Sequence, residues 1–459
     1  MGNQVIEKGL FTFLFPFQFL KKDHARLLKA LEEDGFTNRF IKNSKTNRDE
    51  TLQQYFYPFI EEKLFGKEYS AIHLNHFKKR FKTTGEFRKH EKVCPFILDE
   101  LEVIVCPFMI GFIKVTIQIE RMTLAHSIDF IATFRELTKQ LPEKVVLVYE
   151  SRTVENSEDM ILNLCIPSIK PFMYEQVHTG YYGSLPYFED ERMFTLLYLE
   201  VENTEAFTDT DFYRILQLDG TDHDGQPKNS SKNTAYMESY LKTHRYPRWE
   251  TDVYLFFTLQ VMSVVAKQKE MHVQAVHHVQ TTLFYNLLWH YFYRVVLLKF
   301  TYEHSEIKWA NDPVIAESLI EKITLFSSKY FFKQVAVHSS GRAIAKIIRQ
   351  QLRVDELYEE VKQSVSDLYR VVEDTNNNRY NQLLFVLTVF TVISGIFGMN
   401  LVIESWDQPI QFSALKTMSF FEVIAFFTGL IGIWISILLA VGAIIRKVMQ
   451  VVRKKKYER

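Results

Sequence analysis

The stretch Arg379–Asn400, RYNQLLFVLTVFTVISGIFGMN, determines how we expect the rest of this chain to be organised. No charged side chain occurs between Tyr380 and Ile403. At about 1.5 Å of rise per residue, a helix of this length crosses the roughly 30 Å hydrocarbon core of a bilayer. The sequence therefore predicts a membrane span here.

A second uncharged run, Val423–Ile445, follows a short polar connection and precedes a basic end. Basic segments beside a membrane span stay in the cytoplasm. We therefore expect a two-helix transmembrane hairpin in a multi-pass protein of the cell inner membrane, with both termini in the cytoplasm. The lipid bilayer is then an expected partner.

The first run closes with Gly398-Met399-Asn400. A late two-helix hairpin with this tripeptide at the outer end of its first helix, followed by a short loop and a basic tail, resembles the CorA family of magnesium and divalent-cation channels. The resemblance covers about Gly341–Arg459. It implies an α/β cytoplasmic domain with α/β/α layers, a long stalk helix, the C-terminal hairpin and assembly of five copies into a homopentameric funnel.

The same resemblance makes Gly398, Met399 and Asn400 the selectivity motif. Because Mg²⁺ releases its waters reluctantly, we expect a ring of Asn400 side-chain carbonyls to hold the hydrated ion. Mg²⁺ is thus the expected transported ion, with Co²⁺ or Ni²⁺ as further candidates.

Further residues are expected along the ion path, at positions that repeat with the helical turn. Counting back from Asn400 places four side chains toward the axis: Asn377, Leu384, Thr388 and Thr391. In the outer loop, Glu404 and Asp407 give a mildly acidic surface that would concentrate cations.

Composition narrows the function classes. Lys plus Arg equals Asp plus Glu at 55 each in 459 residues, so no global field attracts nucleic acid, and we expect none as a partner. The chain has no Gly-rich phosphate loop, nucleophile elbow or His-Glu-x-x-His motif. We therefore expect neither an enzyme nor an organic cofactor.

The expected organisation divides the chain into six parts. They are a cytoplasmic α/β domain (1–270), its helical part (271–340), a stalk helix continuing into the pore-lining span (341–400), an outer loop (401–422), a second span (423–446) and a basic cytoplasmic tail (447–459). Since no Gly or Pro occurs between Gly341 and Gly395, one unbroken helix is predicted there. Its apolar stripe for a partner is Val354, Leu357, Val361, Val365, Leu368 and Val372.

Local patterns predict strands and helices in the first 332 residues. The expected strands are Leu10–Leu20, Ile97–Val105, Phe108–Glu120, Val145–Tyr149, Ile161–Ile166, Met193–Val201 and Asp252–Val265. The expected helices are Asp23–Glu33, Ile128–Gln140 capped by Ser127, a buried Leu283–Phe300, and one from Asp312-Pro313 to Phe332.

Two questions stay open at this level. The basic cluster from His76 to Lys92 is read as a solvated surface, with contact to an anionic ligand as the alternative. The expected function is a CorA-like cation transporter gated by its cytoplasmic domain. The alternative is a divergent CorA-like membrane effector of type III CRISPR defence, opened by a nucleotide messenger such as a conjugate of S-adenosylmethionine and ATP.

Overall fold

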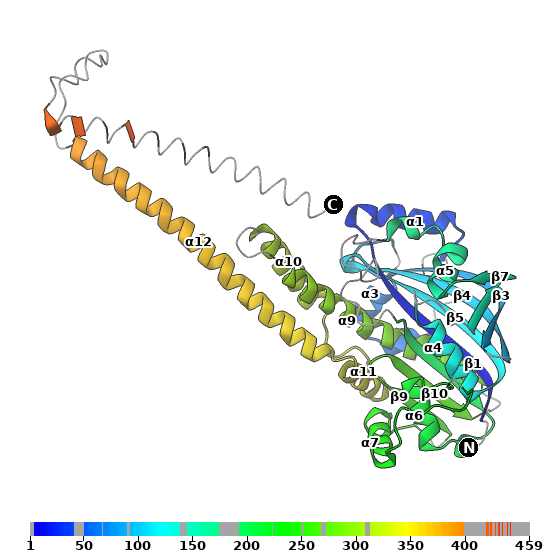
Figure 1. Ribbon diagram of the computed structural model, residues 1–459. Helices are drawn as coiled ribbons and strands as arrows, with labels where there is room; N and C mark the ends of the chain where they lie inside the picture. The colour runs from blue at the N-terminus through cyan, green and yellow to red at the C-terminus, as the bar shows by residue number, and fades with distance from the viewer. Residues whose placement is uncertain are drawn as a thin grey trace. The chain divides into compact units, whose positions relative to one another are not determined.

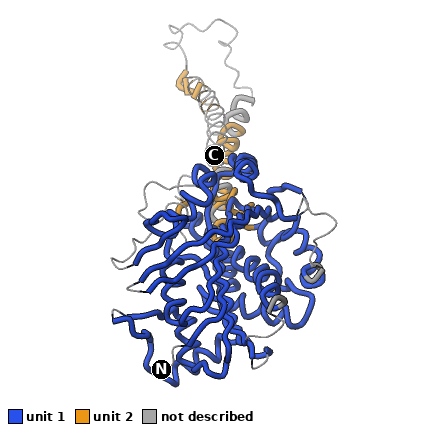
Figure 2. The backbone as a smooth tube through the Cα atoms, turned by 90° about the vertical axis from the view of Figure 1, so that its right-hand side faces the viewer, with its two compact units in different colours: residues 1–305, 324–362 blue, residues 306–323, 363–459 orange. Residues whose placement is uncertain are grey.

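The computed structural model describes residues 4–40, 50–66, 68–89, 92–137, 145–173, 192–222, 224–249, 252–267, 272–307 and 313–398, with scattered single residues between 419 and 441. The chain forms two compact units (Figure 2). Unit 1 comprises residues 1–305 and 324–362, and unit 2 comprises residues 306–323 and 363–459. The sheet and the site described below belong to unit 1.

Unit 1 is built on one 10-stranded mixed sheet with the order β7-β6-β3-β4-β5-β1-β8-β10-β9, and β2 pairs with β3 (Figure 1). All neighbours are antiparallel except β8 and β10, which run parallel. The strands are β1 Val5–Gln18, β2 Thr37–Asn38, β3 Asn75–Lys89, β4 Lys92–Cys106, β5 Ile110–Thr123, β6 Val145–Tyr149, β7 Arg152–Val154, β8 Phe194–Val201, β9 Val253–Phe257 and β10 Val261–Lys267.

Helices connect and cover these strands. They are α1 His24–Glu33, α2 Glu50–Tyr55, α3 Pro58–Leu64, α4 Leu124–Phe134, α5 Ser157–Asp159, α6 Asp209–Gln217, α7 Thr234–His244, α8 His272–His278, α9 Phe284–Ser305, α10 Pro313–Lys329, α11 Ser339–Gln351 and α12 Val354–Gly398.

The two faces of the central strands differ in chemistry because successive side chains point to opposite sides. One face, the apolar face, carries Phe11, Val103 and Val115 into the main hydrophobic core. Helix α4 covers it, and the ring of Phe130 lies 5.2 Å from that of Phe96. The other face, the mixed face, carries Glu102 of β4 and Lys114 of β5, which are partners in the strand register.

Helix α9 packs on the mixed face. Its Tyr291 ring lies 5.6 Å from Phe112 of β5 and 5.3 Å from Phe194 of β8. Nearly all of the helix is buried, as predicted for Leu283–Phe300. The burial explains its apolar character without a membrane.

Several local predictions are wrong. Ser127 lies inside α4, which begins at Leu124 after Thr123, so it does not cap a helix. Residues Met160–Cys165 form a π-helical turn instead of a strand. The single strand expected over Asp252–Val265 is an antiparallel pair, β9 and β10, which turn at residues 258–260.

The stalk is not one unbroken helix from Gly341. Helix α11 ends at Gln351, and α12 begins at Val354 after Arg353, whose φ is +52°. A residue in the left-handed conformation interrupts the hydrogen bonding of a helix. Because Arg353 is neither Gly nor Pro, the sequence gives no sign of this break. Of the six residues of the apolar stripe predicted to meet a partner, Val354, Val361 and Leu368 are already buried within the chain, and the other three are only partly buried.

The predicted transmembrane hairpin is wrong for the part of the chain that the structure describes. None of the described helices is long and apolar enough to cross a membrane. Helix α12 is described only as far as Gly398, and most of Val423–Ile445 lies outside the described residues. This finding overturns the predicted fold class, an α/β/α domain with a membrane hairpin in a homopentameric funnel. The inner-membrane, multi-pass localisation and the description as a membrane channel fall with it.

Candidate functional site

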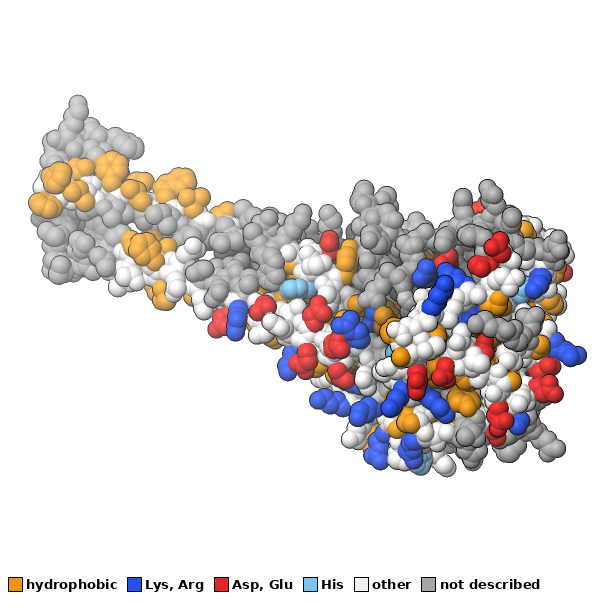
Figure 3. All heavy atoms as spheres, turned by 60° about the horizontal axis from the view of Figure 1, so that its bottom comes forward, with side chains coloured by type: hydrophobic (Ala, Val, Ile, Leu, Met, Phe, Trp, Pro, Cys, Tyr) orange, Lys and Arg blue, Asp and Glu red, His pale blue; other side chains and the backbone are white. Residues whose placement is uncertain are grey.

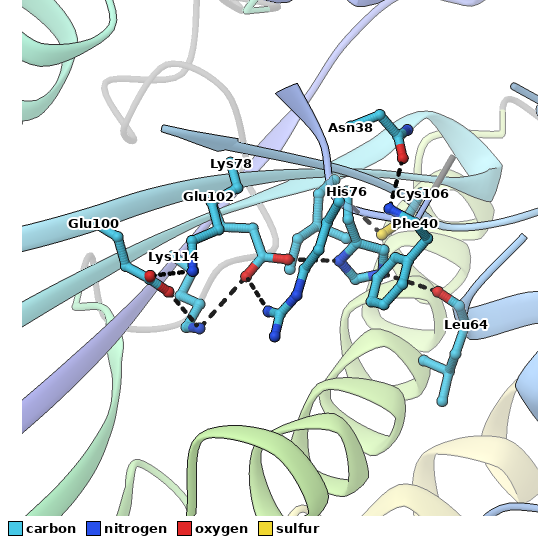
Figure 4. Close-up of polar contacts among 11 residues, drawn as sticks. Asn38, Phe40, Leu64, His76, Lys78, Glu100, Glu102, Cys106 and Lys114 are labelled. Carbon is cyan, nitrogen blue, oxygen red and sulfur yellow. Dashed lines mark hydrogen bonds and ion pairs between the residues drawn. The ribbon is translucent and has the colours of Figure 1, made fainter. Parts of the chain in front are cut away.

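A group of ionisable side chains is buried on the mixed face where β3, β4 and β5 meet (Figure 4). We call it the charge cluster, and it consists of Arg39, His76, Lys78, Glu100, Glu102 and Lys114. Strand alternation places these side chains on one face, and the register sets Lys78, Glu102 and Lys114 side by side on adjacent strands.

Glu102 is the centre of the charge cluster. One carboxylate oxygen lies 2.8 Å from His76 Nδ1, and the other lies 3.4 Å from Lys114 Nζ and 3.5 Å from an Arg39 guanidinium nitrogen. His76 Nε2 lies 2.9 Å from the Leu64 carbonyl oxygen. A carbonyl and an ionised carboxylate can only accept hydrogen bonds, so an imidazolium ring satisfies both contacts.

Glu100 is the second carboxylate. Its side chain pairs with Lys78 and lies 3.4 Å from Lys114 Nζ. Lys114 is therefore shared between Glu100 and Glu102 and is itself buried, with its ammonium 4.4 Å from the centre of the Phe284 ring of α9. That ring excludes water from the ammonium and attracts its charge.

The pKa values of both carboxyl groups reflect two opposing effects. Burial alone would raise the pKa of Glu102, but the charge of Lys114, the His76 hydrogen bond and Arg39 outweigh it and hold this pKa well below its ordinary value. Burial also acts against the charged form of Glu100, and Lys114 and Lys78 together lower its pKa. Both carboxylates are thus ionised at neutral pH.

The N-terminal end of α9 closes over the charge cluster. The Tyr285 ring contacts His76 edge-on at 5.7 Å, and the Arg39 guanidinium lies 5.7 Å from the centre of the same ring. Burial raises the pKa of the Tyr285 hydroxyl, so it stays protonated. The cluster is therefore in direct contact with the first turn of α9.

Polar side chains continue along α9 at intervals of four residues. Asn286 donates to the Tyr55 hydroxyl at 3.0 Å, and its carbonyl accepts from His290 Nδ1 at 2.8 Å. Arg294 then donates to the carbonyl of Leu352 at 2.7 Å. Residues four apart share a helix face, so this row links the cluster end of α9 to the place where α11 ends.

Two side-chain contacts hold the α11–α12 junction, residues 349–358. Arg349 forms a bidentate pair with Asp355 at 2.6–2.9 Å and donates to the Phe332 carbonyl at 3.0 Å. Phe331 lies between the Arg349 guanidinium, 4.6 Å from its ring centre, and the Tyr358 ring, stacked at 3.7 Å. The left-handed Arg353 sits within this frame.

His290 is the buried titratable group between the charge cluster and the junction. Its Nε2 is buried and has no hydrogen-bond partner among the described residues. Burial is the main cause that lowers the pKa of His290 to about 4, and the positive charge of Arg349 adds to it. The ring is therefore neutral at physiological pH, protonated on Nδ1.

The residues predicted to form an ion path belong to unit 2 and are not part of the charge cluster. Gly398 is the last residue of α12, whereas Met399, Asn400, Glu404 and Asp407 lie outside the described residues. Asn377, Leu384, Thr388 and Thr391 are exposed on α12. The hydroxyls of Thr388 and Thr391 each donate to a carbonyl one turn earlier, at 2.8 Å. The ion-path roles stay predictions.

The charge cluster was missed in the sequence. The basic run from His76 to Lys92 was read as a solvated surface, but His76 is buried, and Lys78 and Lys89 are largely buried and paired with Glu100 and Asp129. A usable signal was present, because Glu102 and Lys114 each interrupt an otherwise apolar strand. Charged residues are almost never fully buried unless they are paired.

We searched the described residues for side chains grouped as metal ligands. Within the described residues, no group of three or more His, Cys, Asp or Glu side chains is arranged to hold a metal ion.

Comparison with known proteins found no family model that matches the chain and no similar curated protein.

The Glu102→Gln change tests the charge cluster. It removes a buried negative charge from among several cations, and we expect it to lower the free energy of unfolding at pH 7 by about 3–5 kcal/mol in urea titrations. Because the folded-state pKa of Glu102 lies below the unfolded value of 4.5, its stabilisation is present above that pH and disappears as the pH falls through the folded pKa. The two proteins should therefore converge in acid. The exposed Glu86→Gln is the control, with a change under about 1 kcal/mol, and a similar loss in both variants would contradict the assignment.

His290→Phe tests the buried neutral ring. A His pKa lowered from 6.5 to about 4 means that the folded state resists protonation, so the wild type loses stability as the pH falls from 6.5 towards 4. The loss attributable to this group is about 3 kcal/mol. We expect His290→Phe to remove that part of the slope in urea titrations at several pH values. His338→Phe, at an exposed histidine, should keep the wild-type slope; an unchanged slope in His290→Phe would exclude the buried neutral state.

Proposed function

We propose that this chain is a ligand-responsive regulatory protein of the CorA-like kind. The charge cluster is its sensing end, α9 transmits the change, and α12 carries it to the part of the chain that controls divalent-cation transport. The observation that carries this proposal is the double contact of α9: Tyr285 lies on His76 of the cluster, and Arg294 binds the carbonyl of Leu352 at the junction.

The geometry of α9 supports transmission. The nine helical steps from Tyr285 to Arg294 span about 14 Å of one helix. The helix is buried along this length, so it moves as a body and not by local fraying. A ligand can shift such an equilibrium only by binding one arrangement better than the other, which a charged ligand at the cluster can do.

The choice of divalent-cation transport as the regulated process rests on the resemblance to CorA proteins. The residues that carry it are Gly398, where α12 ends, and the Met399 and Asn400 that follow. A Mg²⁺-limited uptake protein and a nucleotide-opened defence effector both fit this scheme. They differ in the ligand at the sensing end.

We also propose that copies of the chain associate through the distal part of α12. The stripe first expected to meet a partner is already buried within the chain at Val354, Val361 and Leu368. Large hydrophobic side chains are instead exposed further along, with Leu384 at 59%, Phe385 at 70% and Leu387 at 62% (Figure 3). Exposed apolar patches of this kind mark association surfaces.

Self-association is tested with the double variant Leu384→Asp/Leu387→Asp. We expect the wild type to be oligomeric by light scattering after size exclusion, and the variant to dissociate because charges would have to be buried in the contact. Tyr369→Asp, on the same helix and 53% exposed, should leave the oligomer intact. A monomeric wild type would remove this proposal.

Transmission is tested by breaking one contact of α9. Arg294→Met removes the hydrogen bond to Leu352, and we expect faster amide exchange, by tenfold or more, in residues 349–358.

Lys299→Met is the matched control for this experiment. Lys299 is also a buried cation of α9 that donates to a backbone carbonyl, at 2.8 Å, but its acceptor is Phe108 in the β4–β5 turn. Exchange should rise around Phe108 and not at the junction. Equal effects of both variants on residues 349–358 would show general loosening and would refute transmission through α9.

A further inference from the structure

The charge cluster contains more positive than negative groups. Its cations are Arg39, Lys78 and Lys114, and its anions are Glu100 and Glu102. Three positive charges against two negative charges leave a surplus of +1. We infer that this cluster is a binding site for a phosphate-type oxyanion, either free phosphate or the phosphate of a nucleotide. The inference deepens the proposed function by naming the class of its ligand.

The charge balance selects against a divalent cation at this place. Both carboxylates that could ligate Mg²⁺ are already engaged by lysine, arginine or histidine, and the surplus would repel a further cation. A phosphate carries a charge of about −1.5 to −2 near pH 7 and accepts hydrogen bonds through several oxygens. It therefore matches the surplus in sign.

The contacts that Lys114 makes with the two carboxylates are long. Its Nζ lies 3.4 Å from both carboxylates, whereas charge-assisted hydrogen bonds have lengths of about 2.7–2.9 Å. An oxyanion beside this ammonium would gain short contacts that the two glutamates do not provide. Arg39 and Lys78 are partly exposed, at 26% and 22% of their side chains, so the site can be approached from their side.

A second and independent observation is the hydroxyl of Thr116. It lies two residues beyond Lys114 on β5, on the same face, and opposite Glu100 in the strand register. Thr116 is fully buried, and its Oγ1 has no hydrogen-bond partner among the described residues. A buried hydroxyl without a partner is costly, and an oxyanion held by Lys114 would supply the missing acceptor.

An anion at this site would act directly on the sensing contact. It would compete with Glu100 and Glu102 for Lys114, and Glu102 would then depend more on His76 and Arg39. Both of these side chains touch Tyr285 of α9. The changed charge pairing would therefore act first on α9, the helix that reaches the junction.

The test measures binding to the full chain by isothermal titration, with inorganic phosphate, ATP and MgCl₂ as separate ligands. We expect phosphate, ATP or both to bind and MgCl₂ alone not to bind at this site. Binding of ATP without phosphate assigns a nucleotide, and equal binding per phosphate assigns the free anion. No binding of either phosphate compound to the wild type overturns the inference.

Thr116→Val is the decisive variant, because it keeps the shape and removes only the unpartnered hydroxyl. We expect anion affinity to fall about tenfold while the protein becomes no less stable. Thr204→Val is the matched control: Thr204 is also buried with an unpartnered hydroxyl but lies in the turn after β8, and affinity should stay at the wild-type value. Equal affinity in wild type and Thr116→Val overturns the site.

A variant at the partly exposed edge of the site is a further check, in case a variant at a buried position fails to fold. Arg39→Gln should weaken phosphate or ATP binding at least tenfold and make it less sensitive to salt. Amide exchange at residues 349–358 is followed in the same samples. If the anion binds and amide exchange at residues 349–358 does not change, the proposed transmission is refuted but the anion site is not. If no anion binds but Arg294→Met raises this exchange, the anion site alone is refuted.

Discussion

An ionised carboxylate held inside a sheet is the constraint on which the rest of unit 1 depends. Taking Glu102 out of water costs several kcal/mol, and only the close approach of Lys114, His76 and Arg39 compensates for it. These partners come from three different parts of the chain, so the carboxylate is stable only when β3, β4 and β5 pair in the observed register and the segment after β2 lies against them. A shift by one residue would turn Glu102 into the apolar core on the opposite face.

Helix α9 converts this local requirement into a long-range one. Its first turn supplies the rings of Phe284 and Tyr285 that exclude water from the cluster, and a later turn places Arg294 at the α11–α12 junction. Asn286, Arg294 and Lys299 each bond to a group on another element, so the helix cannot rotate or slide without breaking several contacts. The same burial that stabilises α9 therefore makes it a rigid connection between cluster and junction.

Most of this architecture could be predicted where the pattern is local. The apolar run of β1, the alternation of β5 and the apolar patterns of α1 and α9 act over a few residues, and the predicted strands and helices there agree with the structure. The charge cluster could not be predicted, because His76, Glu102 and Lys114 are far apart in sequence and only pairing of the strands brings them together. The uncharged run after Tyr380 led to the wrong prediction of a membrane span, because hydropathy alone does not distinguish a span from an apolar helix with another partner. The break at Arg353 was missed because tertiary contacts, and not a Gly or Pro, produce it.

That break matters for how α12 can respond. The residues on either side of Arg353 favour helix, and the left-handed conformation of Arg353 costs about 1–2 kcal/mol. A continuous helix would recover this energy together with the helical hydrogen bonds that the break removes. The continuous helix is opposed by the hydrogen bond from Arg294 to the Leu352 carbonyl, and by those from Arg349 to Asp355 and to the Phe332 carbonyl. The broken and the continuous arrangements therefore differ by a few side-chain contacts, each worth about 1–3 kcal/mol. A modest change in how α9 is held at the charge cluster is then comparable with the energy that decides whether the helix is broken or continuous at Arg353.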